Sequence, residues 1–269
     1  FRGKKMTDRL DDIAAAMVAR GKGILAADES SGTIKKRFDA IGVESTESNR
    51  RDYRELLFRT GEAMRNHISG VILYDETIRQ KSADGTPLVD LIAASGALPG
   101  IKVDMGAKAL AGHPGELVTE GLDGLRERLD EYRKLGAKFA KWRGVIDIAD
   151  GIPSRGCIAA NAHALARYAA LCQEAGIVPI VEPEVLMDGG HDIDRCFEVT
   201  EAVLNTVYDE LFAQRVRLEG SVLKPNMVIS GKKCASRAGI EEVAEKTVAC
   251  LKRTVPAAVA GIAFLSGGQ

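Results

Sequence analysis

Short apolar runs alternate with longer segments of mixed polarity along the whole chain. Each run is rich in Ile, Val, Leu, Ala or Phe and is bounded by glycine, proline or charged residues, which is the pattern of a buried β-strand. Seven runs fit this description, at residues 21–30, 69–76, 100–106, 137–145, 177–184, 220–227 and 261–268.

The segments between the runs place apolar residues every three or four positions, which is the period of a helix with one buried face. In residues 123–137, for example, Leu125, Leu129 and Tyr132 fall on one stripe. The same spacing predicts helices at 7–20, 162–176 and 241–256.

The alternation of strands and helices predicts a parallel sheet covered by helices, an α/β fold. The runs recur at intervals of roughly 40 residues, and this repeat indicates a (β/α)8 TIM barrel that forms a single domain over residues 1–269. A doubly wound open sheet would place a Gly-x-Gly-x-x-Gly turn after an early strand, whereas Gly-Lys-Gly at 21–23 precedes its strand. Because a barrel of this class has eight strands, we expect the eighth strand and the C-terminal tail to be absent from this sequence.

Composition narrows the class of protein. The chain is 45% hydrophobic and 28% charged with a formal net charge of −1, so no global charge attracts nucleic acid or a membrane surface. No apolar run approaches the ~18 residues of a membrane span, and the first residues lack the apolar core of a signal peptide. Five widely spaced cysteines without a Cys-x-x-Cys pair indicate free thiols and a cytoplasmic location.

Ionisable side chains stand at the C-terminal ends of the predicted strands, where apolar residues are expected. They are Asp28, Lys102, Asp104, Lys141, Arg143, Glu182, Glu184 and Lys224, with Ser266 and Gly267 closing the last run. Residues i and i+2 of a strand share a face, so Lys141 points the same way as Arg143, and Glu182 the same way as Glu184. Because TIM barrels keep their active sites at this end of the strands, the pattern predicts one charged site.

Each of these residues also has a structural interpretation. A charged residue at a strand end can reach solvent or form a structural ion pair, which is the interpretation we favour for Asp104. Residues 28–30 could act only as a helix cap. The four histidines have no ligand spacing, so no metal site is expected. The occurrence of such residues on six strands favours a functional site, because capping and surface pairing do not predict it.

Two lysines and two glutamates in one site suggest iminium chemistry. A lysine amine is a nucleophile only when neutral, and a neighbouring cation lowers its pKa, so Lys141 could activate Lys224. The amine would attack a ketone, and a protonated glutamate would help to expel water. The iminium would then accept electrons from a breaking C–C bond, while Asp28 took the proton from the alcohol. The remaining cations, with the amides at 266–268, suit phosphate groups.

Several segments resemble class I fructose-1,6-bisphosphate aldolases. The motifs GKGILAADES, GIKVDMG, FAKWR, IVPIVEPE, LEGSVLKPNM and FLSGGQ carry the likeness, which extends from Gly21 to Gln269. The resemblance implies a (β/α)8 barrel that reversibly cleaves fructose 1,6-bisphosphate, a small-molecule sugar bisphosphate, to dihydroxyacetone phosphate and glyceraldehyde 3-phosphate. It implies no metal and no cofactor, because the reaction proceeds through a covalent Schiff base on a lysine.

The resemblance also implies a role for each residue of the predicted site. Lys224 corresponds to the Schiff-base lysine, Glu182 to the acid–base group and Glu184 to a second carboxylate near the Schiff base. Lys141 corresponds to the lysine that stabilises developing charge, and Asp28 to the residue linked to C–C cleavage. The implied substrate-binding residues are Lys102, Arg143, Ser30 and Arg37, with Ser266 and Gly267 at the other phosphate.

Two departures and two alternatives accompany the resemblance. The family's phosphate-binding arginine on strand eight and its C-terminal tyrosine have no counterpart in this sequence, and the family's KVDKG pattern is KVDMG here. The resemblance implies a homotetramer. A Schiff-base aldolase for another sugar phosphate is the enzymatic alternative, and a non-catalytic scaffold that binds cytoskeletal or adhesion tails is the other.

Overall fold

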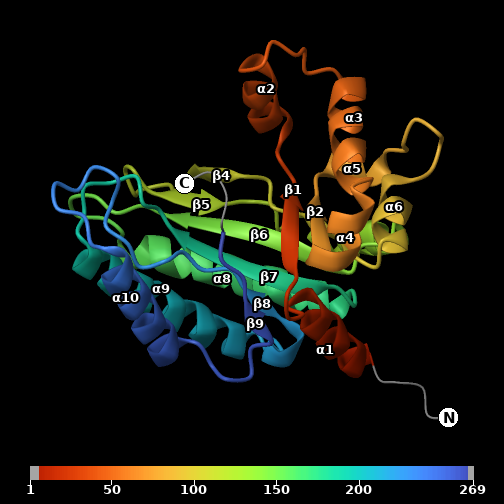
Figure 1. Cartoon of the computed structure of the whole chain (residues 1–269). Helices are drawn as coiled ribbons and strands as arrows, with labels where there is room; N and C mark the ends of the chain where they lie inside the picture. Colours follow the sequence, from red (N-terminus) through yellow and green to blue (C-terminus); the bar gives the residue numbers. More distant parts are fainter. Residues whose placement is uncertain (1–5, 266–269) are drawn as a thin grey trace.

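A seven-stranded parallel sheet dominates the computed structural model, which describes residues 6–265 (Figure 1). Each of the seven predicted runs overlaps one of its strands, so the strand prediction is confirmed. The strands are β1 Gly23–Ala27, β2 Ile68–Leu73, β3 Leu98–Lys102, β6 Phe139–Ile146, β7 Val178–Val185, β8 Val222–Leu223 and β9 Gly261–Ile262.

The strands lie side by side in the order in which they occur along the chain, β1-β2-β3-β6-β7-β8-β9. A doubly wound sheet would reverse its strand order near the middle, whereas this order never reverses. It is the order of a (β/α)8 barrel that lacks one strand, as the sequence predicts. Within the described residues, β1 and β9 remain edge strands. A groove of about 690 Å³ lies between them, lined largely by apolar side chains that include Ile24 and Phe264.

The helices cover the outside of the sheet and one of its ends. Figure 1 shows α8 (Arg155–Glu174), α9 (Ile193–Ala213) and α10 (Ile240–Thr254) along one side of β6, β7 and β8. The predicted helices at 7–20, 123–137, 162–176 and 241–256 correspond to α1, α7, α8 and α10. The helices are α1 Met6–Met17, α2 Ser31–Asp39, α3 Glu47–Phe58, α4 Gly61–His67, α5 Asp75–Arg79, α6 Leu88–Ala94, α7 Leu125–Lys134, α8 Arg155–Glu174, α9 Ile193–Ala213 and α10 Ile240–Thr254.

Two smaller elements interrupt the repeat. An antiparallel hairpin of β4 Ala107–Ala109 and β5 Leu117–Thr119 follows β3, and a 3-10 turn, η1 Leu218–Gly220, precedes β8. The sequence patterns did not place either of them, because both are too short to show a hydrophobic period.

Local sequence explains where the helices begin. Ser30, Thr46 and Ser154 stand at the N-caps of α2, α3 and α8, and each side chain accepts a hydrogen bond from the backbone N–H three residues on. Asp192 does the same for α9. Gly176, with a φ of +73°, follows α8 and allows the turn into β7 that a residue with a Cβ disfavours.

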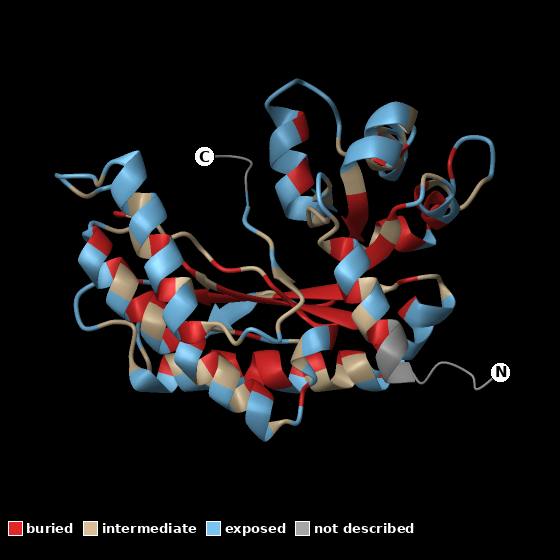
Figure 2. Cartoon of the chain, turned by 60° about the horizontal axis from the view of Figure 1, so that its bottom comes forward, coloured by how far each residue is buried: buried red, intermediate tan, exposed pale blue. Residues whose placement is uncertain are grey.

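The central strands of the sheet are buried, as their red colour in Figure 2 shows, and apolar side chains pack against both faces of the sheet. On the inner face, Leu10 and Met17 of α1 pack against Phe139, Val178 and Val222, which lie at the starts of three strands. Helix α1 therefore covers the N-terminal ends of the strands. The C-terminal ends of the strands are not covered by α1, and the charged residues lie there.

Candidate active site

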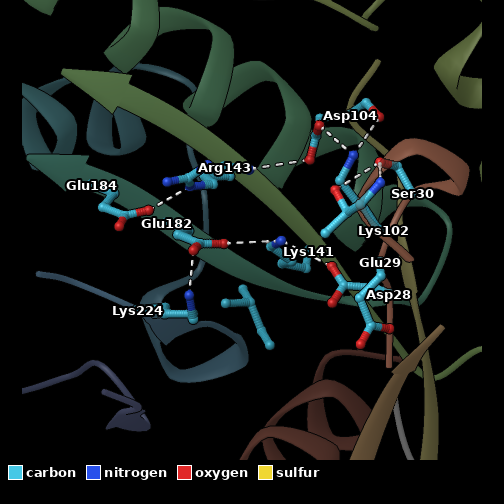
Figure 3. Close-up of polar contacts among 12 residues, drawn as sticks. Asp28, Glu29, Ser30, Lys102, Asp104, Lys141, Arg143, Glu182, Glu184 and Lys224 are labelled. Atoms are coloured by element: carbon cyan, nitrogen blue, oxygen red, sulfur yellow. Dashed lines mark hydrogen bonds and ion pairs between the residues drawn. The ribbon is translucent and has the colours of Figure 1, made fainter. Parts of the chain in front are cut away.

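Four charged side chains contact one another in a row: Lys141 of β6, Glu182 of β7, and Asp28 and Lys224, which directly follow β1 and β8 (Figure 3). Lys224 donates a hydrogen bond to Glu182. The other carboxylate oxygen of Glu182 lies 3.5 Å from Lys141 Nζ, and Lys141 Nζ donates to Asp28 Oδ2 at 2.9 Å. We call Asp28, Lys141, Glu182 and Lys224 the ionic cluster. The structure thus brings together four of the predicted site residues.

Strand register produces this arrangement. Strands β6 and β7 pair with Arg143 opposite Glu182, so that Lys141 and Glu182 are offset by two residues on neighbouring strands. Lys224 follows the last residue of β8, yet its backbone N–H still donates to the carbonyl of Val181 at 2.8 Å. The Lys224 side chain is therefore held beside Glu182 although Lys224 lies just past β8 and not inside the strand, where the predicted run 220–227 had placed it.

The ionic cluster is largely shielded from solvent. The Glu182 side chain is 2% exposed and the Lys224 side chain 16% exposed. Two ammonium groups and two carboxylates balance in formal charge, which limits the cost of removing them from water. Burial lowers the pKa of Lys141, but the charges of Glu182 and Asp28 outweigh it and hold that pKa above the ordinary value. Lys141 therefore remains an ammonium ion at neutral pH.

The relation between the two lysines differs from the sequence-based expectation. The sequence predicts that Lys141 stands beside Lys224 as its neighbouring cation. The structure instead places the Glu182 carboxylate in contact with both ammonium groups. Lys224 is thus already in hydrogen-bond contact with a carboxylate, and the same carboxylate lies between Lys224 and Lys141.

A second group of charges lies next to the ionic cluster. Arg143 Nε donates to a Glu184 carboxylate oxygen, and although burial lowers the pKa of Arg143, this bond raises it above the ordinary value. The Arg143 side chain remains 42% exposed. Lys102 pairs with Asp104 at 2.8 Å, and Asp104 also accepts from the backbone of Gly106. These contacts agree with the structural interpretation of Asp104.

The remaining predicted site residues make contacts elsewhere. Ser30 caps α2 by accepting from Thr33 N at 3.4 Å, and Arg37, 61% exposed, pairs with Glu29 at 2.6 Å. Neither of these contacts joins them to the ionic cluster. Ser266 and Gly267 lie outside the described residues.

Two polar residues that the sequence analysis did not single out support the site. Arg54, on α3 and fully buried, donates to the backbone carbonyls of Ala27 and Glu29. Asn226 accepts from Val185 N at 3.1 Å and donates to Thr200 at 3.1 Å, so it ties the residues after Lys224 to β7 and α9. Arg54 lies four positions before the buried Phe58, and this charged residue on a buried helical stripe was the available signal.

Three further observations concern the thiols, the possible metal ligands and the helices of the part of the chain that the structure describes. All five cysteines are free thiols, and four of them are buried. Residues 6–265 contain no group of three or more His, Cys, Asp and Glu side chains placed to hold a metal ion. None of the helices in that range has both the length and the apolar composition needed to cross a bilayer.

Comparison with known proteins identifies the relatives of this chain. The family model described as fructose-bisphosphate aldolase class-I matches residues 9–269. A probable fructose-bisphosphate aldolase class 1 of Xanthomonas campestris pv. campestris is 64% identical over 262 residues, which is 97% of this chain and 78% of the relative. The cytosolic fructose-bisphosphate aldolase 6 of Arabidopsis thaliana is 57% identical, over 98% of this chain and 74% of its own length.

A solved structure gives the same result for the fold. The fructose-bisphosphate aldolase of Plasmodium falciparum, crystallised with TRAP and a small-molecule inhibitor, superposes with a TM-score of 0.94 and 48% sequence identity. The match covers 98% of this chain and 76% of the Plasmodium chain. The (β/α)8 assignment and the resemblance drawn from the sequence motifs are both confirmed.

Proposed function

This chain belongs to the class-I fructose-bisphosphate aldolase family, and we propose that its Lys224 forms the Schiff base with the substrate. Class I aldolases cleave fructose 1,6-bisphosphate reversibly through a lysine Schiff base and use no metal cofactor. The observation that carries the assignment is the contact of Lys224 with Glu182 inside the buried ionic cluster.

Differences in their surroundings support Lys224 rather than Lys141 as the nucleophile. Lys141 contacts two carboxylates, Asp28 and Glu182, and its raised pKa keeps it protonated. An ammonium ion has no lone pair with which to attack a ketone. Lys224 contacts Glu182, to which it can pass a proton, and its side chain retains some access to solvent. Lys141 is then the cation that stabilises charge on the reacting oxygen atoms.

Glu182 is the proposed proton carrier of the first half-reaction. It accepts a proton from the Lys224 ammonium group, and the freed amine attacks the C2 ketone. A proton then passes from the attacking nitrogen to the former carbonyl oxygen, which gives a neutral carbinolamine while Glu182 stays protonated. Protonated Glu182 then gives its proton to the carbinolamine hydroxyl, water leaves, and a protonated Schiff base remains. Glu182 suits this exchange because it already contacts Lys224 and is shielded from bulk water.

Asp28 is the proposed base for the cleavage step. It takes the proton from the C4 hydroxyl, the C3–C4 bond breaks to release an aldehyde, and the bonding electrons move into the iminium to form an enamine. Asp28 is held 2.9 Å from Lys141 Nζ, so an ammonium group stands next to the oxygen atoms between which the proton moves. Stabilisation of developing charge by a fixed cation in a shielded site is worth several kcal/mol in enzymes, typically about 3.

The cations around the ionic cluster are the proposed contacts of the two phosphates and the sugar hydroxyls. Arg143 is oriented by Glu184 while remaining partly exposed, as a ligand-binding guanidinium requires. Glu184 is also the proposed second carboxylate near the Schiff base. The proposed substrate-binding set is Lys102, Arg143, Ser30 and Arg37, completed by Ser266 and Gly267.

We also propose the domain organisation, the cellular location and the oligomeric state of the protein. We propose a single barrel domain over residues 1–269, because one continuous sheet runs through the described residues. A cytoplasmic location is supported by the Arabidopsis relative, which is named cytosolic, and by the free thiols. A homotetramer is proposed from the resemblance alone.

Steady-state kinetics with a matched pair of lysine variants tests the proposal. We expect the wild-type protein to cleave fructose 1,6-bisphosphate in the presence of EDTA, and Lys224→Met to have no measurable activity with unchanged circular dichroism. Lys252→Met, which alters an exposed lysine in the last turn of α10, should keep wild-type activity. Cleavage by folded Lys224→Met at the wild-type rate would exclude Lys224 as the nucleophile. A protein that forms an adduct but cleaves only other sugar phosphates would favour the enzymatic alternative.

A further inference from the structure

A buried guanidinium from α3 holds the segment that carries Asp28. The Arg54 side chain is 0% exposed, and two of its nitrogens bond to two different backbone carbonyls. Nε donates to the carbonyl of Ala27 at 3.2 Å, and Nη2 donates to the carbonyl of Glu29 at 2.8 Å. These are the carbonyls of the residues immediately before and after Asp28.

The Asp28 segment has no sheet partner of its own. The ladder between β1 and β2 ends with Ala27 opposite Leu73, and α2 begins at Ser31 after its Ser30 cap. Asp28 and Glu29 therefore lie between the hydrogen-bond ladder of the strand and that of the helix, whose first backbone bond runs from Ile34 N to the Ser30 carbonyl at 2.9 Å. The Arg54 fork supplies two hydrogen bonds there, one on each side of the residue whose carboxylate contacts Lys141.

The charge of Arg54 is not matched by close ion pairs of its own. Its nearest carboxylate oxygens are those of Glu29 at 3.7 Å and Glu76 at 3.9 Å, and Glu76 is bound more closely by Arg50 at 2.8 and 2.6 Å. Burial lowers the pKa of Arg54 below its ordinary value despite these carboxylates. A buried guanidinium with distant partners is a poor source of stability compared with an apolar side chain. The short hydrogen bonds of Arg54 are made instead to the backbone carbonyls of Ala27 and Glu29.

We propose that Arg54 is a positioning residue for the cleavage step: by fixing both carbonyls that flank Asp28, it holds the Asp28 carboxylate against Lys141 Nζ. This inference rests on the role proposed above for Asp28. It predicts that a change at Arg54 slows one half of the reaction and leaves the other half unchanged. Schiff-base formation depends on Lys224 and Glu182, which Arg54 does not contact, whereas C–C cleavage depends on Asp28 and therefore on Arg54.

The test uses Arg54→Lys. Lysine keeps a cation beside Glu29 and Glu76, but its single nitrogen cannot replace the two guanidinium nitrogens that bond to the two backbone carbonyls. Two quantities are measured on each protein: the fraction trapped by borohydride with dihydroxyacetone phosphate, and kcat for fructose 1,6-bisphosphate. We expect the trapped fraction and KM to match wild type while kcat falls about 10- to 100-fold, the effect of a displacement near 1 Å of a reacting group. Arg54→Met should show the same pattern with a larger loss of kcat.

Arg50→Met is the matched control, because Arg50 lies on the same helix and binds Glu76 but makes no contact with residues 27–30. It should keep kcat within about twofold of wild type, as expected for a change that leaves the reacting groups in place. If Arg54→Met fails to fold, Arg54→Ala with and without added guanidinium ion replaces it, and the ion is expected to restore kcat to Arg54→Ala and not to affect Arg50→Ala.

Each outcome bears on the inference. Wild-type kcat in Arg54→Lys would overturn it, and so would a loss of trapping in proportion to the loss of kcat, because that pattern marks a purely structural residue. Asp28→Asn separates this result from the proposed function. If Asp28→Asn abolishes cleavage while Arg54→Lys keeps the wild-type kcat, the inference about Arg54 fails and the role of Asp28 stands. If Asp28→Asn cleaves normally, the proposed role of Asp28 itself fails.

Discussion

The carboxylate of Glu182 accepts a hydrogen bond from Lys224 across the neighbouring strands β7 and β8. Lys141 lies 3.5 Å from the other oxygen of the same carboxylate. One carboxyl group thus contacts both the proposed nucleophile and the proposed charge-stabilising cation. This arrangement explains why a lysine stands at the end of a buried strand: its proton has an immediate acceptor.

Replacing Glu182 by Gln removes that acceptor with little change in shape. We predict that Glu182→Gln slows formation of the Schiff base by about 10²- to 10⁴-fold, the usual range for loss of a general acid–base group. The rate at which borohydride-trappable adduct appears with dihydroxyacetone phosphate measures this step. Glu116→Gln is the control, because Glu116 is also a buried carboxylate and accepts a hydrogen bond from the backbone N–H of Ser154, the N-cap of α8. An unchanged rate in Glu182→Gln would remove Glu182 from the proton-transfer role.

Arg143→Met tests the proposed substrate contact. The guanidinium is partly exposed and is oriented by Glu184 next to the ionic cluster. We predict a KM for fructose 1,6-bisphosphate raised about tenfold or more, because a charge-assisted contact with phosphate contributes roughly 1.5–3 kcal/mol. Steady-state kinetics beside Arg253→Met, which changes an exposed arginine of α10, gives the comparison. Equal KM values in the two variants would place the phosphates elsewhere.

The buried ring nitrogens of His191 are expected to make the free energy of unfolding decrease when the pH falls below about 6.5. Both ring nitrogens are buried without a hydrogen-bond partner, and burial lowers the pKa below the ordinary 6.5 although Asp147 and Asp192 oppose the effect. The unfolded chain therefore binds a proton at a higher pH than the folded one. The contribution of this pKa difference to the free energy of unfolding is fully present above about pH 6.5. It is lost as the pH falls toward and through the lower pKa of the folded state.

Urea unfolding at a series of pH values from 8 to 5 measures that response. Below about pH 6.5 the wild-type free energy of unfolding should fall more steeply than that of His191→Phe, by up to about 1.4 kcal/mol per pH unit for one proton. The two proteins should run parallel above that pH. Parallel curves over the whole range would mean that His191 does not titrate differently in the folded state.

Gly100 is expected to be indispensable for packing inside the barrel. A Cβ at this position would lie 2.3 Å from the ring of Phe139, which also covers Gly70 on the next strand. We predict that Gly100→Ala lowers the free energy of unfolding by about 1–3 kcal/mol, as overpacking of a core does. Gly32→Ala on α2 meets no atom within 4 Å and should be neutral or stabilising. Urea midpoints are measured for the two variants. A lower midpoint in Gly100→Ala alone indicates steric conflict, whereas a lower midpoint in both variants indicates a general effect of alanine.

Much of the fold could be predicted from the sequence because its buried strands are continuous apolar runs. Helices with a regular apolar stripe, such as α7 and α10, were found for the same reason. Helix α3 was not placed, since it carries Arg54 on its buried face together with Phe58. A hydrophobic pattern cannot identify the partners of that buried arginine, which are backbone carbonyls at the end of β1 and just after it.

The composition of the site was also predictable, but its pairing was not. Charged residues at the ends of parallel strands must meet at one edge of the sheet, so the convergence of Asp28, Lys141, Glu182 and Lys224 followed from their positions. Which cation meets which carboxylate depends on register between strands, here Arg143 opposite Glu182, and register leaves no mark in one strand's sequence. The sequence therefore put Lys141 beside Lys224, where the structure has Glu182 in contact with both.

The central claim is that Lys224 is the nucleophile, and covalent trapping tests it most directly. The protein is incubated with dihydroxyacetone phosphate and EDTA, reduced with borohydride, digested and analysed by peptide mass. We predict one adduct, on the peptide that contains Lys224, with the same yield when the chelator is present or absent. An adduct on the peptide that contains Lys141, or no adduct in a folded protein that still cleaves fructose 1,6-bisphosphate, would contradict the account.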